Sequence, residues 1–299
     1  MTLEQIRIFL EVAERLHFTR AAEALHLTQS AVSAAIAALE TRHDVRLFDR
    51  VGRHVELTAE GAAFAEQARE VLLAAERATR ALDDLSTMAR GSLTLIGSQT
   101  VASYWLPPLL YRFRQRYPGI QTTLSVGNTE QVAEAVKRGA ADLGVVEGNV
   151  DDPVLRVEPV AHDQLALVVG AAHRWAADRA IDADALRKLP WVLREPGSGT
   201  RAATEALLKS RGLSLSDVTI AFEAPTNEAV RSAVEAGAGA SVLSTSVADS
   251  GFKAGTLQAA ACALPGRHFS TVIHRQRRPS RAVRAFLDMI PGADLRRAG

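Results

Sequence analysis

The chain has 299 residues, of which 47% are hydrophobic and 23% charged, enough for two or three domains with buried cores. A formal net charge of +1 does not fit a protein that coats nucleic acid with a uniformly basic surface. The single cysteine, Cys262, rules out an internal disulfide and favours a buried, inert thiol over a redox switch. No apolar run approaches the roughly 18 to 20 residues of a membrane helix, and residues 1–4 do not begin a signal peptide. We therefore expect a cytoplasmic protein without membrane contacts.

Residues 1–40 carry the periodicity of three short amphipathic helices. Apolar side chains recur at helical spacing in residues 3–16, 18–25 and 32–39. Thr28 suits the N-cap of the third helix, and the small Ala21 and Ala22 allow the second and third helices to approach closely. On spacing alone, a helix-turn-helix and an ordinary helical hairpin remain alternatives.

Residues 45–61, VRLFDRVGRHVELTAEG, contain two short extended runs around a hairpin tip at residues 51–54. Three helices followed by such a hairpin predict a winged helix-turn-helix. Residues 1–58 hold seven arginines and eight acidic residues, so a DNA-binding surface must concentrate its positive charge locally. Four arginines do gather around the hairpin: Arg42, Arg46, Arg50 and Arg53. A solvated charged surface is the alternative.

The segments AAEALHLTQSAVSAAIAALE, LFDR and LTAEG resemble the N-terminus of LysR-type transcriptional regulators, and the resemblance extends along the whole chain. It implies a DNA-binding domain at residues 1–58, a linker and dimerisation helix at 59–89 and an effector-binding domain at 90–299. It also implies double-stranded operator DNA and a small-molecule effector as partners, a homodimer that forms tetramers, and RNA polymerase as a candidate partner. Asp44 stands where relatives usually have a glycine that permits a left-handed helix end, so the end of the third helix is expected to differ.

The exposed side of the predicted recognition helix is polar or small, and it lacks an arginine for guanine. Thymine methyl groups and DNA shape are therefore expected to carry specificity. The arginines of the hairpin, which is the wing of this fold, are expected to contact phosphate or the minor groove. The residues predicted to bind DNA are Thr28, Gln29, Ser30, Ser33, Ala34, Arg50 and Arg53.

Residues 58–88 predict one long helix with Thr58 as its N-cap. Its apolar residues follow a 4-3 spacing, which is typical of a helix paired with another helix. The positions of this seam are Phe64, Ala68, Val71, Ala75, Ala78, Leu82 and Leu85. We expect dimerisation through Phe64, Val71, Ala78, Leu82 and Leu85. Packing of the helix against its own domain is the alternative.

From residue 93 the chain alternates strands and helices, which predicts parallel sheets with helices on both faces. The expected strands are residues 93–97, 120–126, 142–147, 165–170, 191–194, 219–222 and 239–243. The expected helices are residues 106–117, 130–138, 183–189, 200–211 and 228–236. One doubly wound domain and two smaller lobes remain alternatives on this pattern. The family resemblance implies two α/β lobes similar to a periplasmic binding protein, with lobe I at about 90–162 and 268–299 and lobe II at about 163–267.

Three strand-to-helix turns, at residues 97–100, 127–129 and 196–201, present hydroxyl groups and free backbone N–H groups, which favour an anion. The residues expected to bind a small anionic effector are Ser98, Gln99, Thr100, Thr129, Ser198, Gly199, Thr200 and Arg201. Arg201 or Arg194 would add a bidentate contact to an oxyanion. Each Ser or Thr is alternatively a plain N-cap.

Other sequence features say less about function. The eight histidines show no metal-ligand spacing, so neither a metal site nor a cofactor is expected. No catalytic constellation stands out, and we expect no enzymatic activity. An α/β solute-binding protein or enzyme with a helical appendage is the alternative function. The basic residues after 274 are interpreted as a solvated surface, with an interface as the alternative: Arg275, Arg277, Arg278, Arg281 and Arg284.

Overall fold

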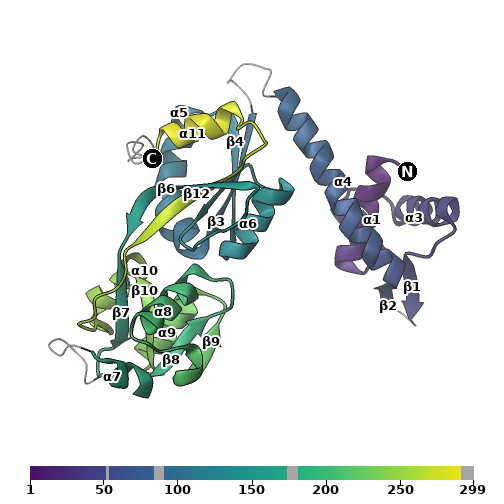
Figure 1. Cartoon of the computed structure of the whole chain (residues 1–299). Helices are drawn as coiled ribbons and strands as arrows, with labels where there is room; N and C mark the ends of the chain where they lie inside the picture. The colour runs from purple at the N-terminus through teal and green to yellow at the C-terminus, as the bar shows by residue number, and fades with distance from the viewer. Residues whose placement is uncertain (52–53, 84–90, 174–180, 291–299) are drawn as a thin grey trace. The chain divides into compact units, whose positions relative to one another are not determined.

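The computed structural model describes residues 1–51, 54–83, 91–173 and 181–290. The chain divides into two compact units, Met1–Leu82 and Asp83–Gly299. The first contains helices and a two-stranded hairpin, and the second contains two α/β lobes (Figure 1). In the described part of the chain, no helix is long and apolar enough to cross a membrane.

The first unit begins with three helices, α1 (Leu3–Arg15), α2 (Phe18–Ala24) and α3 (Gln29–His43). Thr28 is the N-cap of α3, because its hydroxyl accepts a hydrogen bond from the Ala31 N–H at 3.2 Å. Helix α3 ends at Asp44, which adopts the left-handed conformation with φ of 51°. Asp tolerates this conformation better than most residues, so the expected difference at the end of α3 is absent and the helix closes with a left-handed cap.

Apolar faces of the three helices form one core, as their periodicity predicted. The fully buried side chains are Ile6, Phe9, Val12, Ala21, Ala22, Val32, Ile36 and Leu39. Strand β1 (Phe48–Val51) then pairs antiparallel with β2 (His54–Leu57). The Glu40 carboxylate accepts hydrogen bonds from the N–H groups of Leu47 and Phe48, which ties this hairpin to α3. The winged helix-turn-helix is therefore confirmed.

Helix α4 (Ala59–Asp83) starts at Thr58, whose hydroxyl accepts from the Gly61 N–H at 2.9 Å. A Cβ atom at Gly61 would lie 2.1 Å from the Leu47 carbonyl oxygen, so this close approach requires glycine. The first turns of α4 pack on the core of their own unit: the Phe64 ring lies 4.7 Å from that of Phe9, and Ala68 is buried. Val71, by contrast, is 40% exposed.

The dimer seam predicted along α4 is thus partly occupied by contacts within the unit. Ala78 is exposed, whereas the Leu82 side chain and Leu85 lie outside the described residues. Dimerisation through these positions stays a prediction, as do the domain boundaries at residues 58/59 and 89/90.

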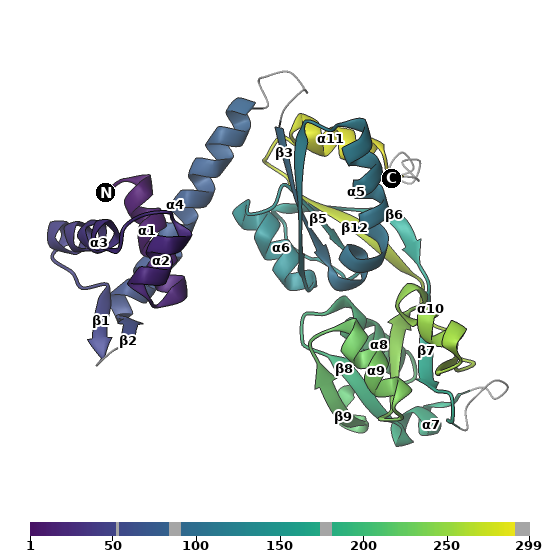
Figure 2. The same ribbon diagram turned by 180° about the vertical axis from the view of Figure 1, so that it is seen from behind.

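Lobe I contains a five-stranded sheet in the order β4-β3-β5-β12-β6. Its strands are β3 (Gly91–Ser98), β4 (Ile120–Gly127), β5 (Leu143–Val146), β6 (Leu155–Asp163) and β12 (Arg267–His274). Its helices are α5 (Leu106–Arg116), which a π-helical turn at Val101–Trp105 precedes, α6 (Thr129–Arg138) and α11 (Arg281–Asp288). Helices α5 and α11 pack on one sheet face through Leu93 and Leu95, and α6 packs on the other through Ile96 (Figure 2).

Lobe II repeats this three-layer arrangement with the strand order β11-β7-β10-β8-β9. Its strands are β7 (Leu165–Gly170), β8 (Pro190–Arg194), β9 (Thr219–Ala224), β10 (Ala240–Ser244) and β11 (Leu257–Ala259). Its helices are α7 (Ala183–Lys188), α8 (Gly199–Ser210), α9 (Asn227–Glu235) and α10 (Thr245–Ala254), besides a 3-10 turn at Leu215–Asp217. Strands buried on both faces explain the nearly continuous apolar runs in the sequence.

Every strand and helix expected from residues 93–243 is present, and the two α/β lobes implied by the family resemblance are confirmed, in place of the alternative of one doubly wound domain. The expectation of purely parallel sheets is wrong. Strand β12 runs antiparallel to β5 and β6, and β7 runs antiparallel to β10 and β11. The cause is that β6 carries the chain out of lobe I and β12 returns it, so these strands run in opposite directions. They pair at the crossing point, where His162 lies opposite His268.

Candidate functional site

The exposed side of α3 presents most of the residues predicted to read DNA. Thr28, Gln29, Ser30 and Ala34 are exposed and Ser33 is half-buried. Their polar side chains are organised by contacts within the helix, with the Gln29 amide donating to the Ser33 hydroxyl at 2.8 Å. This surface can give hydrogen bonds and methyl contacts. The Arg50 side chain and Arg53 lie outside the described residues, so their role as wing contacts stays a prediction.

A basic hollow beside the wing was missed by the sequence interpretation. It measures about 460 Å³ and is lined by Arg15, His17, Arg20, His54 and Glu56, among others. His17 also caps α2, because its ring nitrogen accepts from the Arg20 N–H at 3.4 Å. These groups come from α1, α2 and β2, so only the folded unit brings them together. The signal in the sequence was the His-Phe-Thr-Arg stretch at the start of α2.

The predicted effector residues of the two lobes meet in one buried cluster. Ser98, Thr100 and Thr129 of lobe I and Ser198 and Thr200 of lobe II are all at most 5% exposed. The first turn contacts lobe II directly, because the Gln99 side-chain oxygen accepts hydrogen bonds from Asn227 N and Arg194 Nη1, both at 2.5 Å.

The third turn packs as closely against lobe I. A Cβ atom at Gly199 would lie 2.8 Å from the Gly148 nitrogen and 2.9 Å from Glu147 Cγ. A Cβ at Gly148 would in turn lie 2.5 Å from the Thr129 hydroxyl. Glycine at 199 therefore lets the two lobes touch at this point, whereas glycine at 148 leaves room for Thr129 within lobe I.

Two residues at the centre of the cluster were not predicted, Glu147 and Asn227. The Thr100 hydroxyl donates to Glu147 Oε1 at 3.2 Å and accepts from the Asn227 amide at 2.9 Å. Burial raises the pKa of the Glu147 carboxyl, against the opposing effects of Arg267 and of the Thr100 hydrogen bond. A carboxyl group with a raised pKa is a hydrogen-bond donor in its neutral form. In the sequence, the signal for Glu147 was an acidic residue placed between an apolar strand and a glycine.

Three polar atoms of this cluster are buried without a hydrogen-bond partner in the described part of the protein: Thr129 Oγ1, Glu147 Oε2 and Thr200 Oγ1. An unpaired buried polar atom costs about 1 to 3 kcal/mol, so such atoms are uncommon in a folded core. Here they come from both lobes and surround the contact between Gly148 and Gly199.

Helices α6, α8 and α9 all begin at this cluster. Their N-caps are Asn128, Ser198 and Thr226, each of which accepts a hydrogen bond from its own helix. Ser198 therefore has the N-cap role that was the alternative interpretation, whereas Thr129 follows the cap residue Asn128. Three helix N-termini place partial positive charge around the cluster.

The two arginines considered for an oxyanion are already paired. Arg194 forms two hydrogen bonds with the Glu195 carboxylate, both at 2.8 Å. Arg201 binds Glu205 at 3.0 Å and Glu223 at 2.7 Å. Both guanidinium groups therefore bind the protein's own carboxylates instead of making the bidentate contact with an oxyanion that was expected from one of them.

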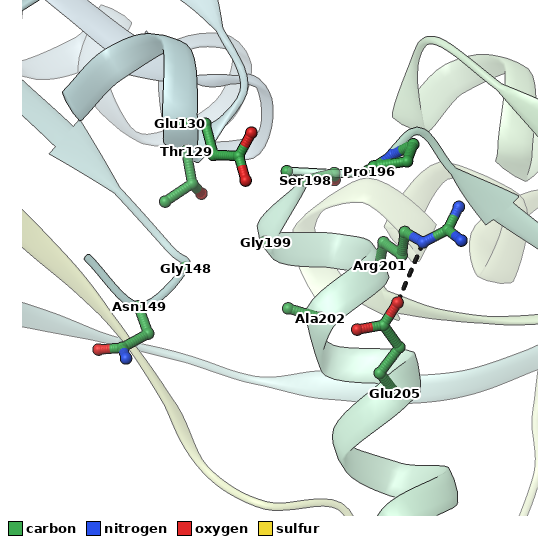
Figure 3. A pocket seen from close by; sticks show the side chains of 11 residues that line it. Thr129, Glu130, Gly148, Asn149, Pro196, Ser198, Gly199, Arg201, Ala202 and Glu205 are labelled. Carbon is green, nitrogen blue, oxygen red and sulfur yellow. Dashed lines mark hydrogen bonds and ion pairs between the residues drawn. The ribbon is translucent and has the colours of Figure 1, made fainter. Parts of the chain in front are cut away.

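An open pocket of about 400 Å³ leads into the same contact between the lobes (Figure 3). Thr129, Glu130, Gly148 and Asn149 line it from lobe I, and residues 196–199, 201, 202 and 205 line it from lobe II. Figure 3 shows Glu130 and Glu205 on its walls, with Arg201 beside Glu205. The charged groups of this mouth are thus mainly acidic, while the uncharged donors lie at the buried cluster. Within the described residues, no group of three or more His, Cys, Asp or Glu side chains is arranged to hold a metal ion.

A winged helix-turn-helix joined to a two-lobed α/β domain with a polar cleft defines a DNA-binding protein that responds to a small molecule. A sequence model described as "LysR substrate binding domain" matches residues 86–293. A second, described as "Bacterial regulatory helix-turn-helix protein, lysR family", matches residues 3–62. The chain belongs to the LysR family and is a DNA-binding transcriptional regulator with an effector-binding domain.

Curated relatives carry the names of regulators. "Uncharacterized HTH-type transcriptional regulator YeiE" of Escherichia coli K12 is 36% identical over 299 residues, which cover 99% of each chain. "HTH-type transcriptional regulator CysL" of Bacillus subtilis is 33% identical over 83% of this chain and 82% of its own. Among solved structures, full-length CbnR complexed with its target DNA has the same fold, with a TM-score of 0.75 and 24% identity over 100% of both chains. The regulatory domain of Synechocystis PCC6803 CcmR in complex with 2-PG matches 67% of this chain and 96% of its own, with 29% identity and a TM-score of 0.62.

Proposed function

We propose that this regulator binds a small oxyanion in the buried cluster between its lobes, and that this binding changes how a homodimer engages operator DNA. The observation that carries the proposal is the set of unpartnered buried atoms on Thr129, Glu147 and Thr200. A ligand that pairs with all three removes their desolvation cost and gains charge-assisted hydrogen bonds, each worth about 1.5 to 3 kcal/mol.

The charge of the ligand follows from what surrounds it. Hydroxyl groups, backbone N–H groups and three helix N-termini are donors or carry partial positive charge. A neutral Glu147 adds one more donor, and its raised pKa favours that form. Arg194 and Arg201 are engaged by carboxylates, so they position the turns rather than neutralise the ligand. The 2-PG complex of the CcmR domain shows that a related two-lobed domain takes up a small molecule, which supports the site by analogy.

The DNA-binding half of the proposal rests on α3 and the wing. The exposed residues from Thr28 to Ala34 would enter the major groove, with Arg50 and Arg53 on the backbone or minor groove. Arg20, His17 and His54, at the hollow beside the wing, would add phosphate contacts. In the homodimer we place the α4 seam from Val71 onward, because Phe64 and Ala68 already pack in their own unit. Tetramers and contacts with RNA polymerase remain expectations from the family resemblance, a cytoplasmic location remains an expectation as well, and we propose no enzymatic step.

The experiment is a thermal-shift screen of the full-length protein with sulfate, phosphate, 2-PG and small carboxylates, followed by DNA gel shifts with the best ligand. A ligand that binds only the folded state raises the melting temperature. Thr100→Val with Ser198→Ala should abolish that rise, because both hydroxyls belong to the cluster. The matched control is Thr123→Val with Ser216→Ala, two exposed positions outside it. Ligand stabilisation that survives in the first pair, or disappears in the control pair, would place the effector elsewhere.

A further inference from the structure

Lobe I carries a second concave site where the end of α5 meets α11. The pocket measures about 390 Å³, and it shares no lining residue with the cleft between the lobes. Its chemistry comes from Arg116, Tyr117, Arg281, Arg284, Asp288 and Met289. Helices α5 and α11 lie side by side on the same face of the sheet (Figures 1 and 2).

Aromatic packing beneath the pocket holds the two helices together. The Phe113 ring lies 5.0 Å from Tyr117 and 5.4 Å from Phe286, so one buried ring contacts the end of α5 and the middle of α11. The α11 residues at the pocket are 281, 284, 285 and 288, which is the spacing of a single helix face. The charged side chains are therefore carried by fixed helices and not by a loop.

The charge of the pocket is positive. Three guanidinium groups and one carboxylate give a formal charge of 3 − 1 = +2. The Arg116 guanidinium lies 5.7 Å from the Tyr117 ring centroid, a distance at which the ring attracts and orients the cation. Among the described residues, Arg284 donates one hydrogen bond, from Nη1 to the Pro279 carbonyl, which leaves its other N–H groups for a ligand.

We infer that this pocket binds a small polyanion, a molecule with at least two oxyanion charges, through Arg116 and Arg284. Two planar guanidinium groups match the paired oxygens of phosphate or carboxylate, and Tyr117 and Met289 form a wall that suits a short carbon skeleton. The Asp288 carboxylate offsets one of the three positive charges, and it limits the site to a ligand whose own negative groups lie away from that carboxylate. The regulator would then recognise a second anion independently of the cleft.

The test uses full-length protein, with pyrophosphate and citrate as separate probes in calorimetric titrations at constant ionic strength. Arg116→Ala with Arg284→Ala should weaken binding at least tenfold, because each change removes a charge-assisted contact. The matched control is Arg112→Ala with Arg114→Ala, two exposed arginines of α5 that do not line the pocket and that change the net charge equally. Asp288→Asn should strengthen binding severalfold, because it removes the opposing carboxylate.

If pyrophosphate and citrate each bind, the site takes polyanions in general. If only one of them binds, the site is specific for phosphate or for carboxylate groups. The binding that depends on Arg116 and Arg284 should persist in the Thr100→Val, Ser198→Ala variant, which separates it from any binding of these anions in the cleft. The inference is overturned if neither probe binds the wild type or if both arginine pairs weaken binding equally.

Discussion

The buried Glu147 makes the stability of the two-lobed unit depend on pH in a direction that can be tested. Burial raises its pKa in the folded state above the value in the unfolded chain. Between these two pKa values the folded state holds a proton that the unfolded state has lost. The free energy of unfolding therefore falls as pH rises, by at most about 1.4 kcal/mol per pH unit for one group. The contribution of Glu147 is fully present below its unfolded pKa and is lost as pH rises through its folded pKa.

Glu147→Gln should remove this dependence. The amide keeps the size of the side chain, still accepts from the Thr100 hydroxyl and donates in place of the neutral acid. All three tryptophans lie at or after residue 105, so fluorescence in urea follows the two-lobed unit alone. The difference in unfolding free energy between the variant and the wild type should increase with pH. Glu130→Gln, an exposed carboxylate at the same cleft, controls for loss of one charge. A difference between Glu147→Gln and the wild type that is constant across pH would refute the assignment.

Three further predictions concern other parts of the molecule. Gly199→Ala should force the lobes apart and lower the free energy of unfolding by about 1 to 3 kcal/mol, because the new Cβ would lie 2.8 Å from the Gly148 nitrogen. The thermal stabilisation produced by the ligand should fall as well. The control is Gly212→Ala, where the space is open and φ is +71°, so that only local backbone strain is expected. Val71→Asp with Leu82→Asp should dissociate the dimer in sedimentation experiments, and an intact dimer would reject the α4 seam. Arg53→Ala should weaken binding to all DNA sequences and reduce the salt slope by about one; a loss confined to one operator would contradict its phosphate role.

Local signals explain why most helices could be predicted from the sequence. Thr28 and Thr58 are caps whose hydroxyls act on their own helices, so their roles are visible within four residues. The buried strands were similarly visible, because side chains packed on both faces leave an apolar run such as residues 165–170. Strands β6 and β12 were missed. They alternate polar and apolar residues, β6 contains Pro159, and their pairing joins positions more than 100 residues apart.

The site was predictable where it depends on turns and unpredictable where it depends on partners. Ser98 and Thr100 lie at the carboxyl end of β3, and Ser198 and Thr200 follow β8, so each pair lies at the strand ends of its own sheet, where ligands commonly bind. By contrast, the engagement of Arg201 depends on Glu223, which reaches it from the next strand of lobe II. An arginine with a free guanidinium and one engaged by carboxylates look the same in a sequence. The same holds for Arg277, a tail residue interpreted as solvated surface, which donates to the carbonyls of Val136 and Lys137 at the end of α6.

One buried guanidinium links the turn before α8 to the two strands that carry the chain between the lobes. Arg267, at the start of β12, donates to the Asp163 carboxylate at the end of β6 and, at 3.2 Å, to the carbonyl of Gly199. The Ser244 hydroxyl completes the contacts of Asp163 from β10. A ligand that pulls the start of α8 toward lobe I would act on Arg267 through its hydrogen bond to the Gly199 carbonyl, a contact with a charged group worth about 1.5 to 3 kcal/mol. Breaking the buried Arg267–Asp163 ion pair would cost about 3 to 5 kcal/mol. That cost exceeds the roughly 1 to 3 kcal/mol of a typical coupling between sites, so we expect β6 and β12 to shift together, with the turn before α8 coupled to them through the weaker Gly199 contact.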